Sequence, residues 1–264
     1  MNKLELANQL ALVTGASSGL GVDFARQLAA RGASLILVAR REEQLKTVAA
    51  EIEKDFGVSV QTICMDLAVP GAPQALYDQL QQRAIHVNVL VNNAGFGIYG
   101  DFAETPWERQ KAMLDIDIIT LTHMTRLFVQ DMLARKSGYI LQVASTAAYQ
   151  PTPTYACYSA AKAYVLLMGE ALNSELRNSG VSVTVVSPGI TATEFLKVSG
   201  QTPSLYQRLT MMDSPSVTRI GIEAMLKRRS SVIPGFLNSL VVFSTRLIPS
   251  SIQATVARVL MTHV

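Results

Sequence analysis

The chain has 264 residues, of which 49% are hydrophobic, so it holds enough apolar material for a sizeable buried core. Its net charge of +3 is too small to indicate a nucleic-acid partner, and no basic stripe with interleaved aromatics is present. Two cysteines, Cys64 and Cys157, form neither a disulfide framework nor a metal-ligand pattern. We therefore expect no metal and no nucleic acid, and a cytoplasmic location.

The N-terminal stretch MNKLELANQLALVTG lacks the apolar region of a signal peptide. No uncharged apolar stretch is long enough to span a bilayer. Both features agree with the expected location.

Strand-like and helix-like segments alternate along the chain. The β-rich runs predict strands at 10–15, 34–40, 58–66, 88–95, 139–145 and 181–189, with a further short candidate at 230–235. Several runs are apolar throughout, as in parallel sheets that are covered on both faces. We predict one α/β domain over 1–264, a doubly wound Rossmann-type parallel sheet with helices on both faces.

Helices are predicted between these strands. The first ends at Gly32, and the second covers 41–56, with Glu42 and Lys46 at i,i+4 spacing and Gly57 as its C-cap.

Two more helices follow further along the chain. The sequence TPWE (105–108) matches a capping box with proline at the first helical position, and predicts the start of a long helix. Another helix is predicted over roughly 155–178, capped at Gly180.

A glycine-rich loop, TGASSGLG (14–21), follows the first strand and opens the first helix. Gly15, Gly19 and Gly21 would permit a tight turn and let the backbone approach a pyrophosphate at the helix N-terminus. The alternative is an ordinary glycine-rich turn. Its place directly after the first strand favours dinucleotide binding.

Two arginines end the second strand. An acid there would bind the ribose 2′-hydroxyl of NAD, whereas an arginine would pair with the 2′-phosphate of NADP. Arg40 and Arg41 precede the first acid, Glu42, so NADP(H) is favoured. The alternative is that both arginines are solvated; we expect Arg41 to be solvated and Arg40 to hold the phosphate.

The segment TYACYSAAK (154–162) carries the candidate acid–base group. Tyr158 and Lys162 share a helix face, and the ammonium would lower the pKa of the phenol. Ser145, at the end of a strand, could polarise a carbonyl oxygen. The alternative is a packed tyrosine beside a surface lysine. Tyr155 is the other tyrosine of this segment, but it is a weaker candidate because no lysine follows it four residues later.

Taken in order, these motifs resemble the short-chain dehydrogenase/reductase family. The resemblance covers about 8–195 and includes the glycine loop, Asp66, NNAG (92–95), Ser145, the Tyr158–Lys162 pair and PGITAT (188–193). The stretches VARREEQL and VIPG are similar to NADP-preferring reductases of the DltE-like type.

The resemblance implies a role for each matched residue. Tyr158 would be the general acid or base, Lys162 would bind the nicotinamide ribose, and Ser145 would hold the substrate oxygen. Asp66 would meet the adenine amine, and Asn92, with its neighbours, would line the cofactor cleft. The full predicted cofactor set is Gly15, Ser17, Ser18, Gly19, Leu20, Gly21, Arg40, Asp66, Leu67, Asn93, Ala94, Gly95, Tyr158, Lys162, Pro188, Gly189, Ile190 and Thr193.

The segment MLDIDIIT (113–120) departs from the family pattern. The family has an asparagine in a proton relay where this chain has Asp117, which we include among the catalytic candidates. Aspartate lacks the amide donor and brings a charge that is costly to bury unpaired. Asp117 could be ionised and paired with Lys162 through water, be protonated and act as a donor, or leave the relay broken; the first two are favoured. Asp115 is expected at solvent or a neighbouring subunit.

Residues 194–215 are expected to form a substrate lid. Their apolar side chains favour a hydrophobic or bulky carbonyl substrate, or else simply pack the lid on the core: Phe195, Leu196, Leu205, Leu209, Met211 and Met212.

Residues 230–264 form an apolar C-terminal extension without Asp or Glu, in which Arg246 and Arg258 are the full charges. This segment could pack on a partner subunit, cover the substrate cleft or lie on an anionic membrane. Subunit packing is favoured, in a homodimer or homotetramer.

The predicted function is an NADP(H)-dependent oxidoreductase, which transfers a hydride between nicotinamide and a carbonyl or alcohol substrate. Two alternatives stay open. One is a catalytically weak NADP(H)-binding regulator or sensor, favoured by Asp117, and the other is a membrane-peripheral reductase of lipid-type carbonyls.

Overall fold

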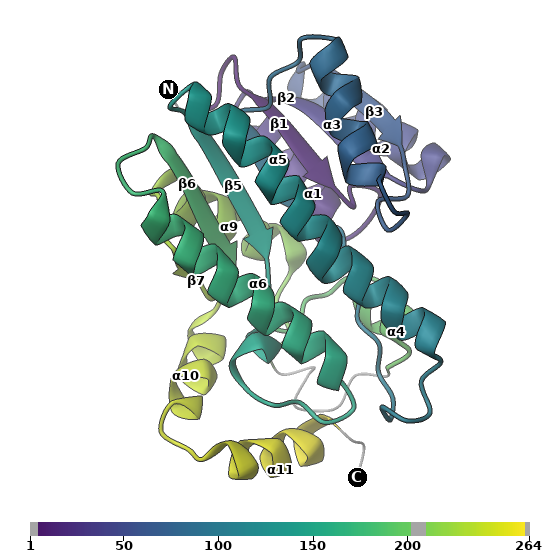
Figure 1. Ribbon diagram of the computed structural model, residues 1–264, viewed down its shortest axis with the longest axis vertical. Helices are drawn as coiled ribbons and strands as arrows, with labels where there is room; N and C mark the ends of the chain where they lie inside the picture. Colours follow the sequence, from purple (N-terminus) through teal and green to yellow (C-terminus); the bar gives the residue numbers. More distant parts are fainter. Residues whose placement is uncertain (1–4, 202–209, 262–264) are drawn as a thin grey trace.

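A computed structural model describes residues 5–201 and 210–261. Its centre is a seven-stranded sheet in the order β3-β2-β1-β4-β5-β6-β7, with every neighbouring pair parallel (Figure 1). The strands are β1 (Leu10–Thr14), β2 (Ser34–Ala39), β3 (Val60–Cys64), β4 (Val89–Asn92), β5 (Gly138–Val143), β6 (Val181–Val186) and β7 (Ser231–Val232). The order reverses between β1 and β4, which confirms the predicted doubly wound topology.

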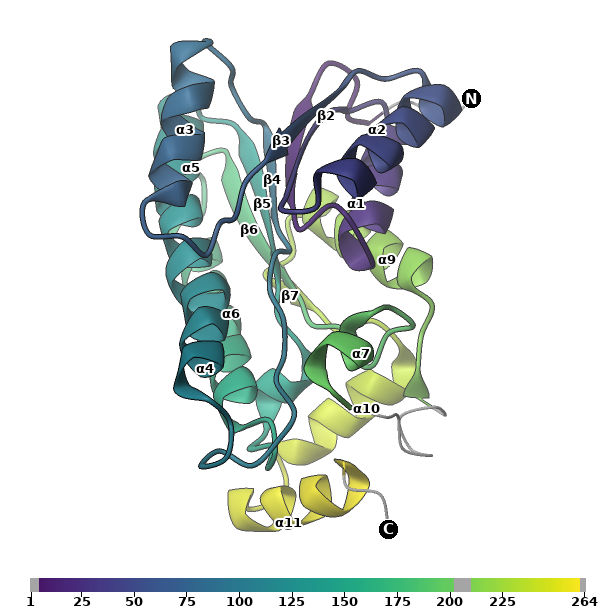
Figure 2. The same ribbon diagram turned by 90° about the vertical axis from the view of Figure 1, so that its right-hand side faces the viewer.

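Helices cover both faces of the sheet (Figure 2). On one face lie α1 (Leu20–Ala29), α2 (Glu42–Phe56) and α9 (Ser214–Leu226). On the other lie α3 (Ala72–Gln82), α4 (Trp107–Leu114), α5 (Leu121–Ala134) and α6 (Ala156–Glu175). Helix α3 was not among the predicted elements.

The strand side chains explain this layering. Along β1, Ala11 and Val13 join the cluster under α1 and α2, whereas Leu12 joins the cluster under α3 and α5. Because successive side chains point to opposite faces and both are covered, a continuously apolar strand is buried along its whole length.

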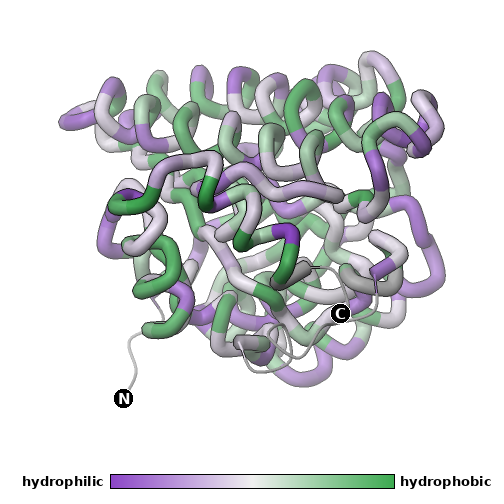
Figure 3. The backbone as a smooth tube through the Cα atoms, turned by 90° about the horizontal axis from the view of Figure 1, so that it is seen from below, coloured by the Kyte–Doolittle hydropathy of each residue, from purple (hydrophilic) through white to green (hydrophobic). Residues whose placement is uncertain are grey.

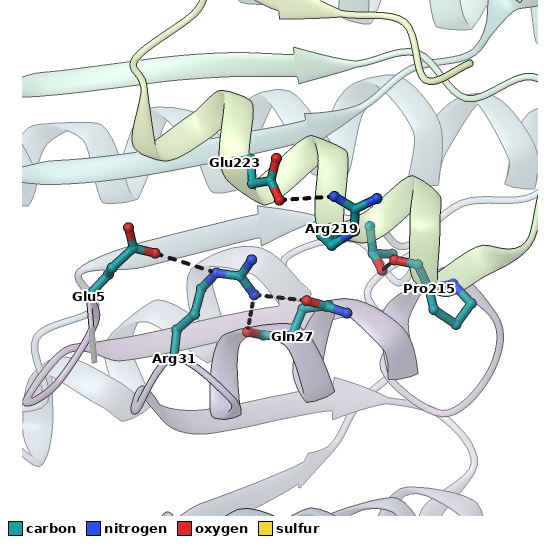
Figure 4. Close-up of polar contacts among 7 residues, drawn as sticks. Glu5, Gln27, Arg31, Pro215, Arg219 and Glu223 are labelled. Carbon is teal, nitrogen blue, oxygen red and sulfur yellow. Dashed lines mark hydrogen bonds and ion pairs between the residues drawn. The ribbon is translucent and has the colours of Figure 1, made fainter. Parts of the chain in front are cut away.

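On the α1 and α9 side, polar contacts lie within α9 and around the end of α1 (Figure 4). Arg31 donates to the Gln27 side chain and backbone and pairs with Glu5, 3.7 Å away. In α9, Arg219 pairs with Glu223 at 3.1 Å. These exposed pairs contribute little to the free energy of unfolding; the packing beneath them dominates.

The cap predictions had mixed outcomes. Gly57, with φ +65°, is the C-cap of α2, and Lys46 pairs with Glu42 at 2.8 Å, as predicted. The capping box is wrong: the N-cap of α4 is Pro106, without a side-chain cap, and the Thr105 hydroxyl donates instead to the Asp101 carbonyl.

The predicted cap at Gly180 is also wrong. Helix α6 ends at Glu175, with Leu176 as its C-cap. Gly180 has φ +87° and lies against the Lys136 backbone, where a side chain would not fit, so it serves the turn into β6.

Two helices form the C-terminal end, α10 (Phe236–Thr245) and α11 (Ser250–Met261). They lie beyond the carboxyl ends of β5 and β6, with α11 outermost (Figures 1 and 2).

Candidate active site

A cavity of about 820 Å³ lies at the carboxyl edge of the sheet, where the loops after β1, β2, β4, β5 and β6 meet. Ligands of open parallel sheets bind at this edge, beside the switch in strand order. All of the predicted site residues line this cavity except Gly21, Asn92 and Asp117. The motifs singled out in the sequence therefore come together at one cavity.

The glycine loop is held to β4 by the side chain that ends β1. Thr14 Oγ1 accepts hydrogen bonds from the backbone N–H groups of Asn93 and Ala94, at 3.0 and 2.9 Å. In return, Asn93 Nδ2 donates to the Thr14 carbonyl at 2.9 Å. Gly15 has φ +66°, and a side chain there would crowd Asn93. These bonds fix the floor of the cavity.

Gly21 acts behind the loop rather than in the cavity. A Cβ at this position would collide with the Gly15 carbonyl oxygen. Because glycine leaves that space empty, α1 begins directly behind the loop, and Gly19 and Leu20 at its N-terminus line the cavity. The N-terminal N–H groups of a helix favour a bound anion.

Asn92 does not line the cavity, contrary to the expectation for NNAG. Its side chain is buried and its Nδ2 donates to Thr125 Oγ1 at 3.0 Å. Strand alternation turns Asn92 into the core and leaves Asn93 at the cavity.

Both arginines after β2 are exposed and line the cavity. Arg40 is 69% exposed and pairs with Asp66 at 3.6 Å. Arg41 was expected to be solvated, but its Nε donates to Ser17 Oγ at 3.2 Å and its Nη1 pairs with Glu194 at 3.3 Å. Arg41 therefore bridges the glycine loop and the start of the expected lid, while its side chain stays 45% exposed at the N-cap of α2, as expected for a solvated helix-start residue.

The acid–base candidates meet across two elements. Ser145 follows β5, whereas Tyr158 and Lys162 lie one turn apart on α6. Lys162 Nζ donates to the Val143 carbonyl at 3.2 Å and lies 5.6 Å from the centroid of the Tyr158 ring. This places a hydroxyl, a phenol and an ammonium at one wall of the cavity.

The pKa of Tyr158 is raised well above its ordinary value of 10.0. Burial is the main cause, the nearby Asp117 carboxylate adds to it, and a hydrogen bond with Ser145 acts in the opposite direction. The prediction of a phenol with a lowered pKa is therefore wrong for this arrangement, because desolvation dominates.

Asp117 faces the core because Lys162 is there. It lies on the same buried stripe as Met113, Ile116 and Thr120, and its side chain is 0% exposed. Its Oδ2 is 3.5 Å from Lys162 Nζ, and neither carboxylate oxygen has a well-formed hydrogen bond within the described residues. Burial raises the pKa of Asp117, and the Lys162 charge opposes this shift.

Two local features surround the Asp117–Lys162 pair. Residues Asp115–Thr120 form a π-helical segment between α4 and α5, a geometry common at functional sites. A Cβ at Gly95 would collide with Asp117 Oδ1 and lie 3.4 Å from Lys162 Nζ. Asp115 points away from the cavity and pairs with Lys111 at 2.5 Å.

The short chain dehydrogenase family matches residues 9–204. The chain belongs to this family. The match confirms the resemblance read from the motifs, while the DltE-like grouping stays a prediction.

Relatives of this short-chain dehydrogenase carry several names. It is 35% identical over 209 residues to the very-long-chain 3-oxoacyl-CoA reductase of Anas platyrhynchos, covering 75% of this chain and 66% of that protein. It is 30% identical over 196 residues to the 7beta-hydroxysteroid dehydrogenase of Collinsella aerofaciens, covering 74% of each chain. The chain spans 56% to 66% of the length of three very-long-chain 3-oxoacyl-CoA reductases that it matches.

Solved structures show the same fold. A structure from work on 7beta-hydroxysteroid dehydrogenase stereoselectivity superposes with a TM-score of 0.87 at 26% identity, covering 99% of this chain and 100% of that chain. A short-chain dehydrogenase from Sphingobium yanoikuyae in complex with NADPH superposes with a TM-score of 0.80 at 28% identity. The match covers 90% of this chain and 94% of that chain.

The C-terminal helices of this short-chain dehydrogenase form part of the cavity. Asn238 and Val242 of α10 and Gln253, Val256 and Ala257 of α11 line it. Covering the cleft was one of the three options for the acid-free tail, and the position of these residues agrees with that option. The individual lining positions carried no sequence signal, because they depend on how the tail folds back.

The described part of the segment expected to form a lid lies at the cavity. Helix α7 (Phe195–Ser199) begins with Phe195, which lines the cavity. Its ring packs against the Tyr158 ring, with 5.4 Å between the two ring centroids. Leu205 and Leu209 lie outside the described residues. Met212 pairs in an isolated bridge with Thr191, which anchors the far end of the segment.

Tyr155 is a cavity residue that sequence reasoning passed over. Its hydroxyl donates to Ser199 Oγ at 3.0 Å and lies 2.8 Å from Gln201 Oε1. Burial raises the pKa of Tyr155 to about 12. It therefore serves as a neutral hydrogen-bonding group beside the lid.

Within 5–201 and 210–261, no group of three or more metal-ligating side chains is close enough to hold a metal ion. No helix in this part of the chain is both long and apolar enough to cross a bilayer.

Proposed function

We propose that this short-chain dehydrogenase transfers a hydride between NADP(H) and a carbonyl or alcohol substrate. The observation that carries the proposal is the meeting of Ser145, Tyr158 and Lys162 at one wall of a cavity whose floor is the glycine loop. When bound, the nicotinamide would supply the hydride to the carbonyl carbon.

The residues of the chain supply the other half of the reaction. The Ser145 hydroxyl would donate a hydrogen bond to the carbonyl oxygen, and Tyr158 would give its phenolic proton to that oxygen as the hydride arrives. In the reverse direction, the Tyr158 phenolate accepts the proton from the alcohol. Lys162, held by the Val143 carbonyl, would bind the nicotinamide ribose and balance the charge on the phenolate.

The cofactor fits the residues that form the floor of the cavity. The loop backbone, α1's N-terminus and the missing side chain at Gly21 suit a pyrophosphate. Asp66, Asn93 and the segment from Pro188 to Thr193 would flank the rest of the dinucleotide.

Arg40 and Arg41 would hold the 2′-phosphate of NADP(H) together, since both line the cavity. We expect Arg40→Ala and Arg41→Ala each to weaken NADPH binding by about tenfold, the effect of losing one charge-assisted contact. NADH binding would change little, because NADH lacks that phosphate. Fluorescence titration of both cofactors measures this, and an equal loss for NADH would contradict it.

The substrate would be a bulky, largely apolar carbonyl compound. Phe195, Val242 and Val256 give the substrate side of the cavity an apolar lining. The names of the relatives, a 7beta-hydroxysteroid dehydrogenase and very-long-chain 3-oxoacyl-CoA reductases, agree with this class.

The first test is the initial rate of NADPH oxidation with a panel of steroid ketones, 3-oxoacyl thioesters and small ketones, with NADH in parallel. We expect turnover with at least one bulky ketone, faster with NADPH. Tyr158→Phe should lose turnover by at least about 100-fold, the usual contribution of a general acid, and still bind NADPH. Full activity of that variant would exclude Tyr158 as the acid.

A second candidate is an NADP(H)-binding sensor with little turnover, favoured by the poorly bonded Asp117 beside Lys162. NADPH binding without turnover on the whole panel would support it. Asp117→Asn would then be expected to create activity.

A homodimer or homotetramer remains part of the proposal. Ile119 and Leu167, on neighbouring helices, are exposed apolar residues that a second copy could cover. Light scattering coupled to gel filtration measures the assembly.

A further inference from the structure

The outward side of the C-terminal helices is apolar and uncovered. We define the outer apolar face as six exposed side chains that do not line the cavity: Phe236, Leu237, Leu240, Phe243, Ile252 and Val259. Their spacing puts the first four on one side of α10 and the last two on one side of α11. Figure 3 looks onto this end of the molecule.

Apolar exposure is concentrated in these helices. Half of the large hydrophobic side chains exposed in the described part of the chain, nine of 18, fall within 236–259. Phe236 alone is 81% exposed. Contiguous apolar patches on a protein surface mark sites that meet another apolar surface.

The charges decide between a lipid surface and a second copy. Residues 230–264 contain no Asp or Glu, and Arg246 and Arg258 are exposed. In a two-fold contact the same patch would meet itself, and residues 230–264 supply no Asp or Glu that could pair with Arg246 across that contact. An anionic lipid surface offers both an apolar layer and the opposite charge.

We infer that the outer apolar face binds an anionic membrane surface, with α10 and α11 lying in its plane. The inner sides of the same helices line the cavity. A bound membrane would therefore lie beside the cavity wall that the apolar substrate contacts.

Sedimentation of the full chain with lipid vesicles tests this inference without any activity measurement. We expect the protein to pellet with vesicles of phosphatidylcholine mixed with phosphatidylglycerol, and much less with phosphatidylcholine alone. Added salt should release it, because salt screens exposed charges.

The variant Phe236→Ser/Phe243→Ser should reduce the partition into mixed vesicles by at least about tenfold, because it removes two exposed aromatic rings that the membrane would bury. Phe102→Ser is the matched control, since Phe102 is 66% exposed outside the tail. Arg246→Gln should weaken binding to the mixed vesicles only. NADPH binding verifies that each variant is folded.

Three results would overturn the inference. The first is no pelleting with either kind of vesicle, and the second is an equal loss of vesicle partition for Phe102→Ser. The third is light scattering in which the double variant turns an oligomer into a smaller species without changing vesicle binding. The last result would assign the face to a second copy of the chain.

Discussion

At the scale of single residues, Asp117 and Lys162 form a buried pair beside Tyr158, the proposed acid–base group. An aspartate is tolerated in the buried stripe of α4–α5 because the ammonium of another helix stands 3.5 Å away. The pair is not fully bonded, so burial still raises the pKa of Asp117. The same carboxylate raises the pKa of Tyr158, which links the unusual residue to the acid–base group.

Removing the charge of Asp117 should therefore move the pH dependence of the reaction. In alcohol oxidation the rate rises as Tyr158 loses its proton, so a lower phenol pKa shifts that rise to lower pH. We expect Asp117→Asn to shift it by roughly one pH unit, the usual effect of one nearby charge. Asp115→Asn is the matched control, and an unshifted profile for Asp117→Asn would contradict the link.

Unfolding experiments give a second readout of the same residue. The pKa of Asp117 lies above its ordinary 3.8 in the folded chain, so the folded state holds that proton more tightly. Its stabilising contribution is complete below pH 3.8 and is lost as pH rises through the raised pKa. The free energy of unfolding of Asp117→Asn, relative to wild type, should therefore increase with pH above about 4.

At the scale of elements, short connections position the site. The loop between β1 and α1 is fixed by Thr14 and Asn93, and α1 can start behind it because Gly21 has no side chain. These are local requirements, so the motif spacing was enough to predict them. The π-helical segment was not predicted, because its hydropathy pattern matches that of a regular helix.

The helix start should be intolerant of one added methyl group. Gly21→Ala would force a Cβ into the Gly15 carbonyl, and we expect a loss of about 1–3 kcal/mol in the free energy of unfolding, with weaker NADPH binding. Gly221→Ala, in α9, is the control, since its Cβ would stand 3.3 Å from Val186. Chemical denaturation and cofactor titration compare the two, and equal effects would refute the steric account.

At the scale of the whole molecule, the C-terminal helices α10 and α11 fold back and line the same cavity as the loops that follow the first strands. Ala257 is 1% exposed and lies at this wall, far along the chain from the glycine loop. The cavity is therefore formed by two distant segments, whose meeting the sequence left as one of three options for the tail.

Filling that wall should change substrate size preference. We expect Ala257→Phe to raise KM for bulky ketones by about tenfold or more, through overpacking, and to leave small ketones nearly unaffected. Thr255→Phe, on the exposed side of α11, is the control. A uniform loss for all ketones would indicate damage to the cofactor site instead.

The sequence by itself determined the parallel sheet, the glycine loop and the group of Ser145, Tyr158 and Lys162. These follow from local periodicity, from turn chemistry and from residues spaced along one helix or strand end. Only the tertiary structure decided that Arg41 bridges the loop and the lid, that Asn92 turns inward, that Asp117 contacts Lys162 and that α10 and α11 line the cavity. Each of these depends on packing between segments distant in the chain, where burial and charge outweigh local preference.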